Sequence, residues 1–284
     1  MIEHRPSQTA ERAALRRAAH RLLDDPRVHE DPLAIEILGP EQAAALRADP
    51  RRLETDPMAP VLRAFLSVRS RVAEDALAEA VAAGVRQYVV LGAGLDTFAY
   101  RNPHPALRVF EVDHPATQAW KRERLAEARI AVPGGVAFVA VDFDQDPPLA
   151  AVLRAAGLRE GEPSFFSWLG VTPYLEPESV LATLAALAPL AAGGGGVAFD
   201  YRVPTESLAP SRRAALEALA ARVVAVGEPF RGAFEPEGLA GVMRAMGFRE
   251  IRDLDPDALN AAFFAGRTDD LRVGGTGHVL TAKA

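Results

Sequence analysis

A glycine-rich turn followed by an acidic residue, "VVLGAGLDTFAYR" at residues 89–101, has the features of a ligand-binding loop. The β-branched run before the turn predicts a buried strand, and Gly92 and Gly94 let the backbone turn sharply and approach a ligand closely. In a parallel sheet this turn lies at the carboxyl end of its strand, where ligands bind. A dinucleotide-binding loop has a third small residue, but here Thr97 follows Asp96, whose charge would repel a pyrophosphate. The loop therefore favours a nucleoside cofactor with a positive charge.

S-adenosylmethionine meets this requirement, because it has a sulfonium, an ammonium and a single carboxylate. We predict that Gly92, Ala93 and Gly94 contact this cofactor, with Asp96 beside it. Asp96 has a second interpretation as the cap of the next helix, whose first backbone N–H groups lack partners. The two roles are compatible, so the sequence leaves open whether Asp96 is more than a cap.

Carboxylates also end the two strands that follow. Asp113 ends "VFEVD" about 20 residues after the glycines, where an acidic side chain commonly accepts the ribose hydroxyls of a nucleoside. Glu111 lies on the same face and is the alternative if the strand ends earlier. The next strand closes with Asp142 and Phe143, which predict a carboxylate for the adenine amino group and a ring against the adenine edge. A ribose contact of this kind would serve the dinucleotide NAD as well as S-adenosylmethionine, so it does not distinguish between these two cofactors.

Strands that alternate with helices must position these residues. Short β-branched or aromatic runs predict strands at residues 87–91, 107–113, 136–142, 164–169, 196–201, 248–254 and 277–283. Helical segments are predicted between them at residues 115–130, 177–190 and 256–266. This alternation is typical of an α/β fold with a mostly parallel sheet that helices cover on both faces.

The part of the chain before this alternation is helical in character. Thr9 is a candidate cap for a helix at residues 10–25, residues 32–39 read as a short helix ended by Gly39-Pro40, and residues 58–83 form a third helical pattern with Gly84 as its stop. These patterns predict an N-terminal helical cap or lid at residues 1–84 and a cofactor-binding domain at residues 85–284. Within that domain, residues 202–235 are a long helical excursion, which predicts a substrate lid.

Composition narrows the class of protein further. The chain has 284 residues and a net charge of −6, which argues against nucleic acid as a partner. It has no cysteine, which excludes disulfides and zinc-thiolate sites, and its six histidines are too scattered to predict a metal site. No apolar run approaches the roughly 18 to 20 residues of a membrane span. We expect a cytoplasmic protein with no membrane partner, and the sequence leaves the oligomeric state open.

The order of several motifs resembles the leucine carboxyl methyltransferase-like family of S-adenosylmethionine-dependent methyltransferases, in its bacterial small-molecule O-methyltransferase branch. The resemblance depends on "GLDT" followed by an arginine and on "EVD" with a proline two residues later, which are more specific than two glycines alone. The motifs are "VRSR" (68–71), residues 89–101, "FEVDHPATQAWKRERL" (110–125), "VDFDQD" (141–146), "GVTPYLEPES" (170–179) and "GEPFRGAFEPEGLAGVMRAMGF" (227–248).

The resemblance implies a Rossmann-like class I methyltransferase fold, with a seven-stranded sheet in which one strand is antiparallel. It also implies that Arg69 pairs with the methionine carboxylate, with Arg71 as the alternative, because a guanidinium meets a carboxylate through two parallel hydrogen bonds. By the same resemblance, the glycines pass under the methionyl part, Asp113 holds the ribose, and Asp142 with its neighbour holds the adenine. Leu169 departs from the family pattern, which has a Glu there in many members, so a backbone contact is all that is expected of it.

The acceptor is expected beyond the fourth and fifth strands, near Tyr174, Tyr201 and Arg202. Methyl transfer is an in-line displacement that depends on alignment and exclusion of water. A carboxylate acceptor is already ionised at neutral pH, whereas a phenol with a pKa near 10 would be helped by a base, and no general base stands out. We therefore predict an O-methyltransferase that acts on a carboxylate of a small molecule, with a phenolic or other hydroxyl natural product as the alternative acceptor.

Two functions of other classes are weighed against this prediction. A nicotinamide-dependent oxidoreductase would need a third small residue in the loop and a catalytic Tyr/Lys or His pair, and neither is evident. A relative that binds a nucleoside without catalysis would keep the loop and the acidic strand ends but transfer no methyl group.

Overall fold

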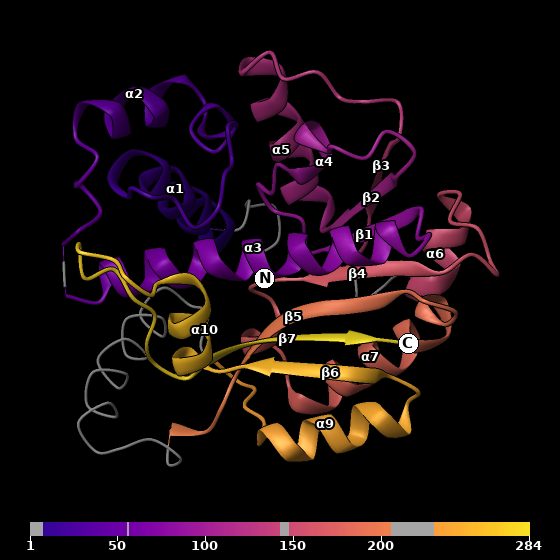
Figure 1. The fold of residues 1–284 in the computed structure, drawn as a ribbon. Helices are drawn as coiled ribbons and strands as arrows, with labels where there is room; N and C mark the ends of the chain where they lie inside the picture. The colour runs from indigo at the N-terminus through magenta and orange to yellow at the C-terminus, as the bar shows by residue number, and fades with distance from the viewer. Residues whose placement is uncertain (1–7, 56, 143–147, 206–229) are drawn as a thin grey trace.

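A seven-stranded sheet forms the centre of the computed structural model, which describes residues 8–55, 57–142, 148–205 and 230–284 (Figure 1). The strands are β1 (Gln87–Leu91), β2 (Arg108–Asp113), β3 (Val136–Ala140), β4 (Ser164–Trp168), β5 (Gly196–Arg202), β6 (Arg249–Leu254) and β7 (Gly277–Lys283). Their order across the sheet is β3-β2-β1-β4-β5-β7-β6, and β7 runs antiparallel to β5 and β6. The predicted mostly parallel sheet with one antiparallel strand is confirmed.

Helices cover both faces of this sheet, because the strand side chains alternate between two apolar clusters. Val89 and Leu91 face the cluster that includes side chains of α6 (Leu149–Ala155), α7 (Pro177–Ala191) and α9 (Pro236–Ala245). Tyr88 and Val90 face the cluster formed with α3 (Ala59–Ala82) and α4 (Phe98–Arg101). The face of α3 also holds α5 (Pro115–Glu127) and α10 (Pro256–Phe263). Both faces are buried, so β1 reads as a continuous apolar run.

The N-terminal helices pack together on the same face of the sheet as α3, and α1 contacts α3 directly. Figure 1 shows α1 and α2 above the N-terminal half of α3. They are α1 (Gln8–Leu23), η1 (Glu36–Leu38, a 3₁₀ turn) and α2 (Pro40–Ala48). Thr9 lies inside α1 and is not its cap, which corrects our prediction. Pro40 begins α2 instead of only ending a helix, because proline fits the first helical position, where no N–H is needed.

The remaining boundaries differ from the predicted ones by a few residues. The predicted strands at residues 136–142 and 164–169 end earlier, at Ala140 and Trp168, so Asp142 and Leu169 belong to the loops that follow. Of the predicted lid at residues 202–235, the structure describes residues 202–205 and 230–235, and the rest lies outside the described residues. The division into domains at residue 84 stays a prediction, and α3 packs directly on β5 and β7. Within the described part of the chain, no helix is both long and apolar enough to cross a bilayer.

Candidate cofactor and acceptor site

The glycine loop turns tightly at the carboxyl end of β1. The backbone N–H groups of Gly92 and Ala93 both donate to the carbonyl oxygen of Val112, at 2.9 and 3.1 Å, so the loop curls over the neighbouring strand β2. Gly92 and Gly94 have φ angles of +65° and +41°. Glycine adopts this left-handed region without the steric cost that a side chain would add.

Asp113, the last residue of β2, fixes this loop in place. Its Oδ2 accepts the N–H of Gly94 at 2.6 Å, and its Oδ1 accepts the N–H of His114 at 2.7 Å. Burial raises the pKa of Asp113, although these two backbone hydrogen bonds oppose the rise. The Asp113 carbonyl also accepts the N–H of Val141, which brings Asp142 to the same edge of the sheet. The structure therefore places the glycine loop, Asp113 and Asp142 together, as the sequence predicts.

Glu111 lies deeper and does not take the place of Asp113. Its side chain is 1% exposed, forms an ion pair with Lys121 at 2.8 Å and accepts the Tyr100 hydroxyl at 2.7 Å. Burial raises the pKa of Glu111, and the charge of Lys121 opposes this effect. Lys121 Nζ also lies 3.5 Å from the Ala93 carbonyl oxygen. Sequence reasoning missed this buried pair, because nothing in the pattern of α5 marks Lys121 as an inward-pointing residue.

Asp96 acts as a cap at the start of α4. Its Oδ1 accepts the N–H of Phe98 at 2.8 Å, which satisfies a backbone group at the first turn of that helix. Thr97, the residue between them, makes no capping hydrogen bond of its own. The cap interpretation of Asp96 accounts for this contact, and its predicted place beside the cofactor stays a prediction.

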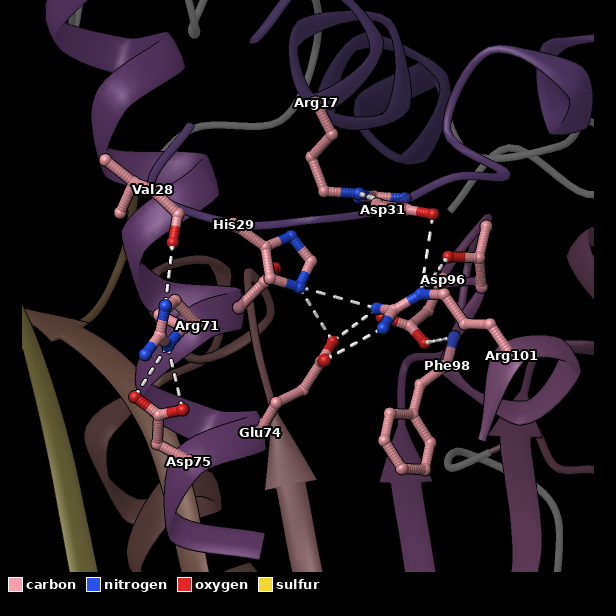
Figure 2. Close-up of polar contacts among 12 residues, drawn as sticks. Arg17, Val28, His29, Asp31, Arg71, Glu74, Asp75, Asp96, Phe98 and Arg101 are labelled. Carbon is pink, nitrogen blue, oxygen red and sulfur yellow. Dashed lines mark hydrogen bonds and ion pairs between the residues drawn. The ribbon is translucent and has the colours of Figure 1, made fainter. Parts of the chain in front are cut away.

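An ion-pair network behind the loop connects it to α3 (Figure 2). Arg101, the last residue of "GLDTFAYR", donates to both carboxylate oxygens of Glu74 on α3, and the Nη1 bond measures 2.9 Å. His29 Nε2 lies 2.9 Å from the same carboxylate, and Asp31 lies 3.4 Å from Arg101 Nε. Burial opposes ionisation of Glu74, but the hydrogen bonds from Arg101 and His29 prevail and lower its pKa to about 2.

Helix α1 lies directly over the glycine loop. Arg17 Nη2 donates to the Leu95 carbonyl oxygen at 2.7 Å. The Cβ of Ala10 would be 3.0 Å from a Cβ added to Gly94, so any residue larger than glycine would press on α1. The N-terminal helix is therefore part of the wall around the candidate cofactor site.

Arg69 lies on the buried side of α3, 9% exposed, and donates from Nη1 to Asp200 Oδ2 on β5 at 2.8 Å. Its Nε is buried with no hydrogen-bond partner among the described residues. Arg71, the alternative, is more exposed and pairs with Asp75 on its own helix. Leu169 is half-buried beside Gly170, at the loop that Arg69 contacts. Sequence reasoning missed Asp200, since no spacing connects it with a residue 131 positions earlier.

Tyr174 and Arg202, which the sequence predicts near the acceptor, both contact Phe230. The Arg202 guanidinium lies 4.2 Å from the centre of the Phe230 ring, and the Tyr174 and Phe230 rings are 5.4 Å apart. Arg202 Nε also donates to Thr276 Oγ1 at 3.2 Å. Burial lowers the pKa of Arg202, against the opposing effect of Tyr174.

Tyr201 points away from Tyr174 and Arg202. It is buried on the other face of the sheet, in the apolar cluster that includes side chains of α6, α7 and α9. Its hydroxyl donates to Asp253 Oδ2 at 2.7 Å, and His278 Nδ1 lies 3.1 Å from the same oxygen. Burial and the Asp253 carboxylate raise the pKa of Tyr201. Phe143, predicted to pack on the adenine, lies outside the described residues. Among the residues described, no three His, Asp or Glu side chains are grouped as metal ligands.

Comparison with known proteins identifies the family. The family model described as leucine carboxyl methyltransferase matches residues 10–188. The chain belongs to this family. A Bacillus subtilis protein, provisionally named the S-adenosyl-L-methionine-dependent methyltransferase YktD, is 30% identical and the alignment covers 99% of each chain. A Mycobacteroides abscessus protein provisionally named for the same activity is 35% identical over 80% of this chain and 72% of its own.

Solved structures agree with this assignment at the level of the fold. A structure from Thermobifida fusca, provisionally named a methyltransferase, matches with a TM-score of 0.56 and 19% identity over 100% of this chain and 97% of that one. A DUF574 family protein from Streptomyces avermitilis matches with a TM-score of 0.53 and 18% identity over 96% of each chain. The predictions of a Rossmann-like methyltransferase fold, of the methyltransferase class and of S-adenosylmethionine as the cofactor are confirmed.

Proposed function

We propose that this methyltransferase transfers the methyl group to a carboxylate of a small molecule and forms a methyl ester. The observation that supports it is Arg202, a half-buried cation at the carboxyl end of β5 with no ion-pair partner among the described carboxylates. Its Nε is held by Thr276 and its plane lies against Phe230, which orients the guanidinium. A planar guanidinium held in this way suits an anionic acceptor.

Cofactor binding is proposed at the edge formed by the glycine loop and the acidic strand ends. Gly92, Ala93 and Gly94 would pass under the methionyl part, with Asp96 nearby. Arg69 would pair with the methionine carboxylate, and its buried Nε, which has no partner among the described residues, could donate to an oxygen of that carboxylate. The adenosine contacts would come from Asp113 to the ribose, from Asp142 and Phe143 to the adenine, and from the backbone of Leu169.

The cofactor supplies an electrophilic methyl group, so the protein needs to orient and desolvate the acceptor. Arg202 would hold the acceptor carboxylate, and Tyr174 with Phe230 would form an aromatic wall that excludes water. An ionised carboxylate attacks without losing a proton, so no base is required. Tyr201 is left out of this proposal, because its hydroxyl is already donated to Asp253.

A methyl-transfer assay tests the proposal. The protein is incubated with methyl-labelled S-adenosylmethionine and with carboxylic acids and phenols that are matched in size. Esters release methanol in mild base, whereas ethers do not, so the released label reports the acceptor class. We expect base-labile product from acids, and at least a tenfold lower kcat/KM in Arg202→Gln, because a charge-assisted hydrogen bond contributes about 1.5–3 kcal/mol. Arg231→Gln, an exposed arginine nearby, is the control. Base-stable product from phenols alone would contradict the proposal.

A further inference from the structure

Asp200 connects three separate parts of the candidate cofactor site. It lies near the carboxyl end of β5, is 3% exposed, and faces α3 on the side opposite to Tyr201. Its Oδ2 accepts Arg69 Nη1 at 2.8 Å, and its Oδ1 accepts the N–H of Gly170 at 2.5 Å. Its backbone carbonyl accepts the hydroxyl of Thr172. One residue therefore ties β5, α3 and the loop after β4 together.

The Arg69 guanidinium is held against the backbone of Gly170 as well. A Cβ added to Gly170 would lie 2.8 Å from Nη2, 3.0 Å from Nη1 and 3.2 Å from Cζ of Arg69. Gly170 has a φ of +75°, which turns the loop so that its N–H points at Asp200. The guanidinium thus occupies the space that a side chain at Gly170 would fill, while the Asp200 carboxylate holds one of its nitrogens.

Such restraint matters because a free arginine loses rotamer entropy when it is fixed by a ligand. A guanidinium fixed in advance binds a carboxylate with less of this cost, and its direction is set before the ligand arrives. Asp200 also lowers the cost of burying the Arg69 charge, since a buried cation without a partner is strongly unfavourable.

We propose that Asp200 is a positioning residue, which aims Arg69 at the amino-acid carboxylate of the cofactor. This inference rests on the proposed contact between Arg69 and that carboxylate. It predicts that loss of Asp200 weakens ligands that have the carboxylate and leaves ligands without it nearly unaffected. A purely structural role would weaken both kinds of ligand equally.

Two ligands separate these roles in calorimetric titrations. S-adenosylhomocysteine has the amino-acid carboxylate, whereas 5′-methylthioadenosine has the same nucleoside without it. For Asp200→Asn we expect affinity for S-adenosylhomocysteine to fall about 10- to 100-fold, the range for loss of a charge-assisted hydrogen bond, with less than a twofold change for 5′-methylthioadenosine. Asp200→Ser, which removes the charge with a smaller side chain, is expected to show the same selective loss if Asp200→Asn does not fold.

Asp24→Asn is the matched control, because Asp24 is 5% exposed and pairs with Arg63 on the same helix α3, away from the cofactor edge. This variant also loses a buried ion pair, and we expect its ratio of the two affinities to equal that of the wild type. Equal weakening of both ligands in Asp200→Asn, or no weakening of either, overturns the inference.

Arg69→Met distinguishes failure of the inference from failure of the proposed function. If Arg69→Met selectively weakens S-adenosylhomocysteine while both Asp200 variants do not, the Arg69 contact stands and the role of Asp200 is overturned. If Arg69→Met binds both ligands as the wild type does, the proposed Arg69 contact is wrong and the inference falls with it. If the inference is correct, adding Asp200→Asn to Arg69→Met causes little further loss of affinity for S-adenosylhomocysteine, because both changes remove the same interaction.

Discussion

The Asp113 carboxylate accepts the backbone N–H of Gly94 at 2.6 Å and so joins the glycine loop after β1 to the end of β2. A second backbone N–H, from His114, reaches the other carboxylate oxygen. Each oxygen has a further lone pair, so the same carboxylate can accept ribose hydroxyls while it holds the loop. Loop geometry and nucleoside binding are therefore expected to depend on one side chain.

Asp113→Asn tests this dependence. The asparagine amide has one accepting oxygen where the carboxylate has two, so the N–H of either Gly94 or His114 loses its partner. We expect S-adenosylhomocysteine affinity to fall at least tenfold and the free energy of unfolding to fall by about 1–3 kcal/mol. Calorimetry and chemical denaturation measure the two effects. Asp75→Asn, which breaks an exposed pair with Arg71, is the control and should change neither by more than about 1 kcal/mol.

Gly170→Ala is expected to displace Arg69, because the new Cβ would lie 2.8 Å from Nη2. Gly84→Ala is its control, since Gly84 also has a positive φ, +111°, but has no atom within 4 Å of an added Cβ. Both variants should lose about 1–2 kcal/mol of stability from the left-handed backbone. In calorimetric titrations, Gly170→Ala is expected to lose affinity for S-adenosylhomocysteine but not for 5′-methylthioadenosine. Gly84→Ala is expected to show no such selective loss. Similar binding by the two variants would contradict this prediction.

Lys121→Met leaves Glu111 buried without its ion-pair partner. We expect the free energy of unfolding at pH 7 to fall by about 3–5 kcal/mol. Glu111 already has a raised pKa, so protonation stabilises the fold. The stabilisation that protonation of Glu111 provides is complete below the pKa of this residue in the unfolded chain. It is lost as pH rises through the higher pKa that Glu111 has in the folded protein. The defect in Lys121→Met should therefore shrink as pH is lowered toward about 4. Lys121→Met combined with Glu111→Gln should recover most of the loss, and a defect that does not vary with pH would contradict this account.

Glu74 makes stability depend on pH in the opposite direction. Its pKa of about 2 is below that of an unfolded Glu, so its contribution is present above the unfolded pKa and is lost as pH falls toward 2. The shift corresponds to a loss on the order of 3 kcal/mol between about pH 4 and pH 2. Glu74→Gln should be less stable at pH 7 and lack this dependence in acid denaturation. Glu79→Gln, an exposed neighbour on α3, is the control and should retain it.

Much of the fold was predictable from the sequence, because local patterns of burial determine it. The runs at 87–91 and 277–283 are strands β1 and β7 to the residue, since each contains β-branched residues and follows a glycine-containing turn. Asp113 could be placed beside the glycine loop for a similar reason, as the ends of neighbouring parallel strands meet at one edge. The start of α1 and the short segment before Pro40 were not predicted correctly, because helix ends depend on capping and packing that a pattern does not specify.

The tertiary structure alone decided which charged side chains point inward and at what. The resemblance favours Arg69 and keeps Arg71 as the alternative, and only the structure shows that Arg69 faces β5 and meets Asp200 while Arg71 turns to Asp75. Tyr201 and Arg202 are adjacent, yet alternation along β5 sends the tyrosine toward Asp253 and the arginine toward Phe230 on the other side. Sequence periodicity reports local geometry, and so it predicted the sheet and the edge at which its strands end. Ion pairs such as Arg69–Asp200 join residues far apart in the chain, and only the packing of α3 on the sheet brings them together.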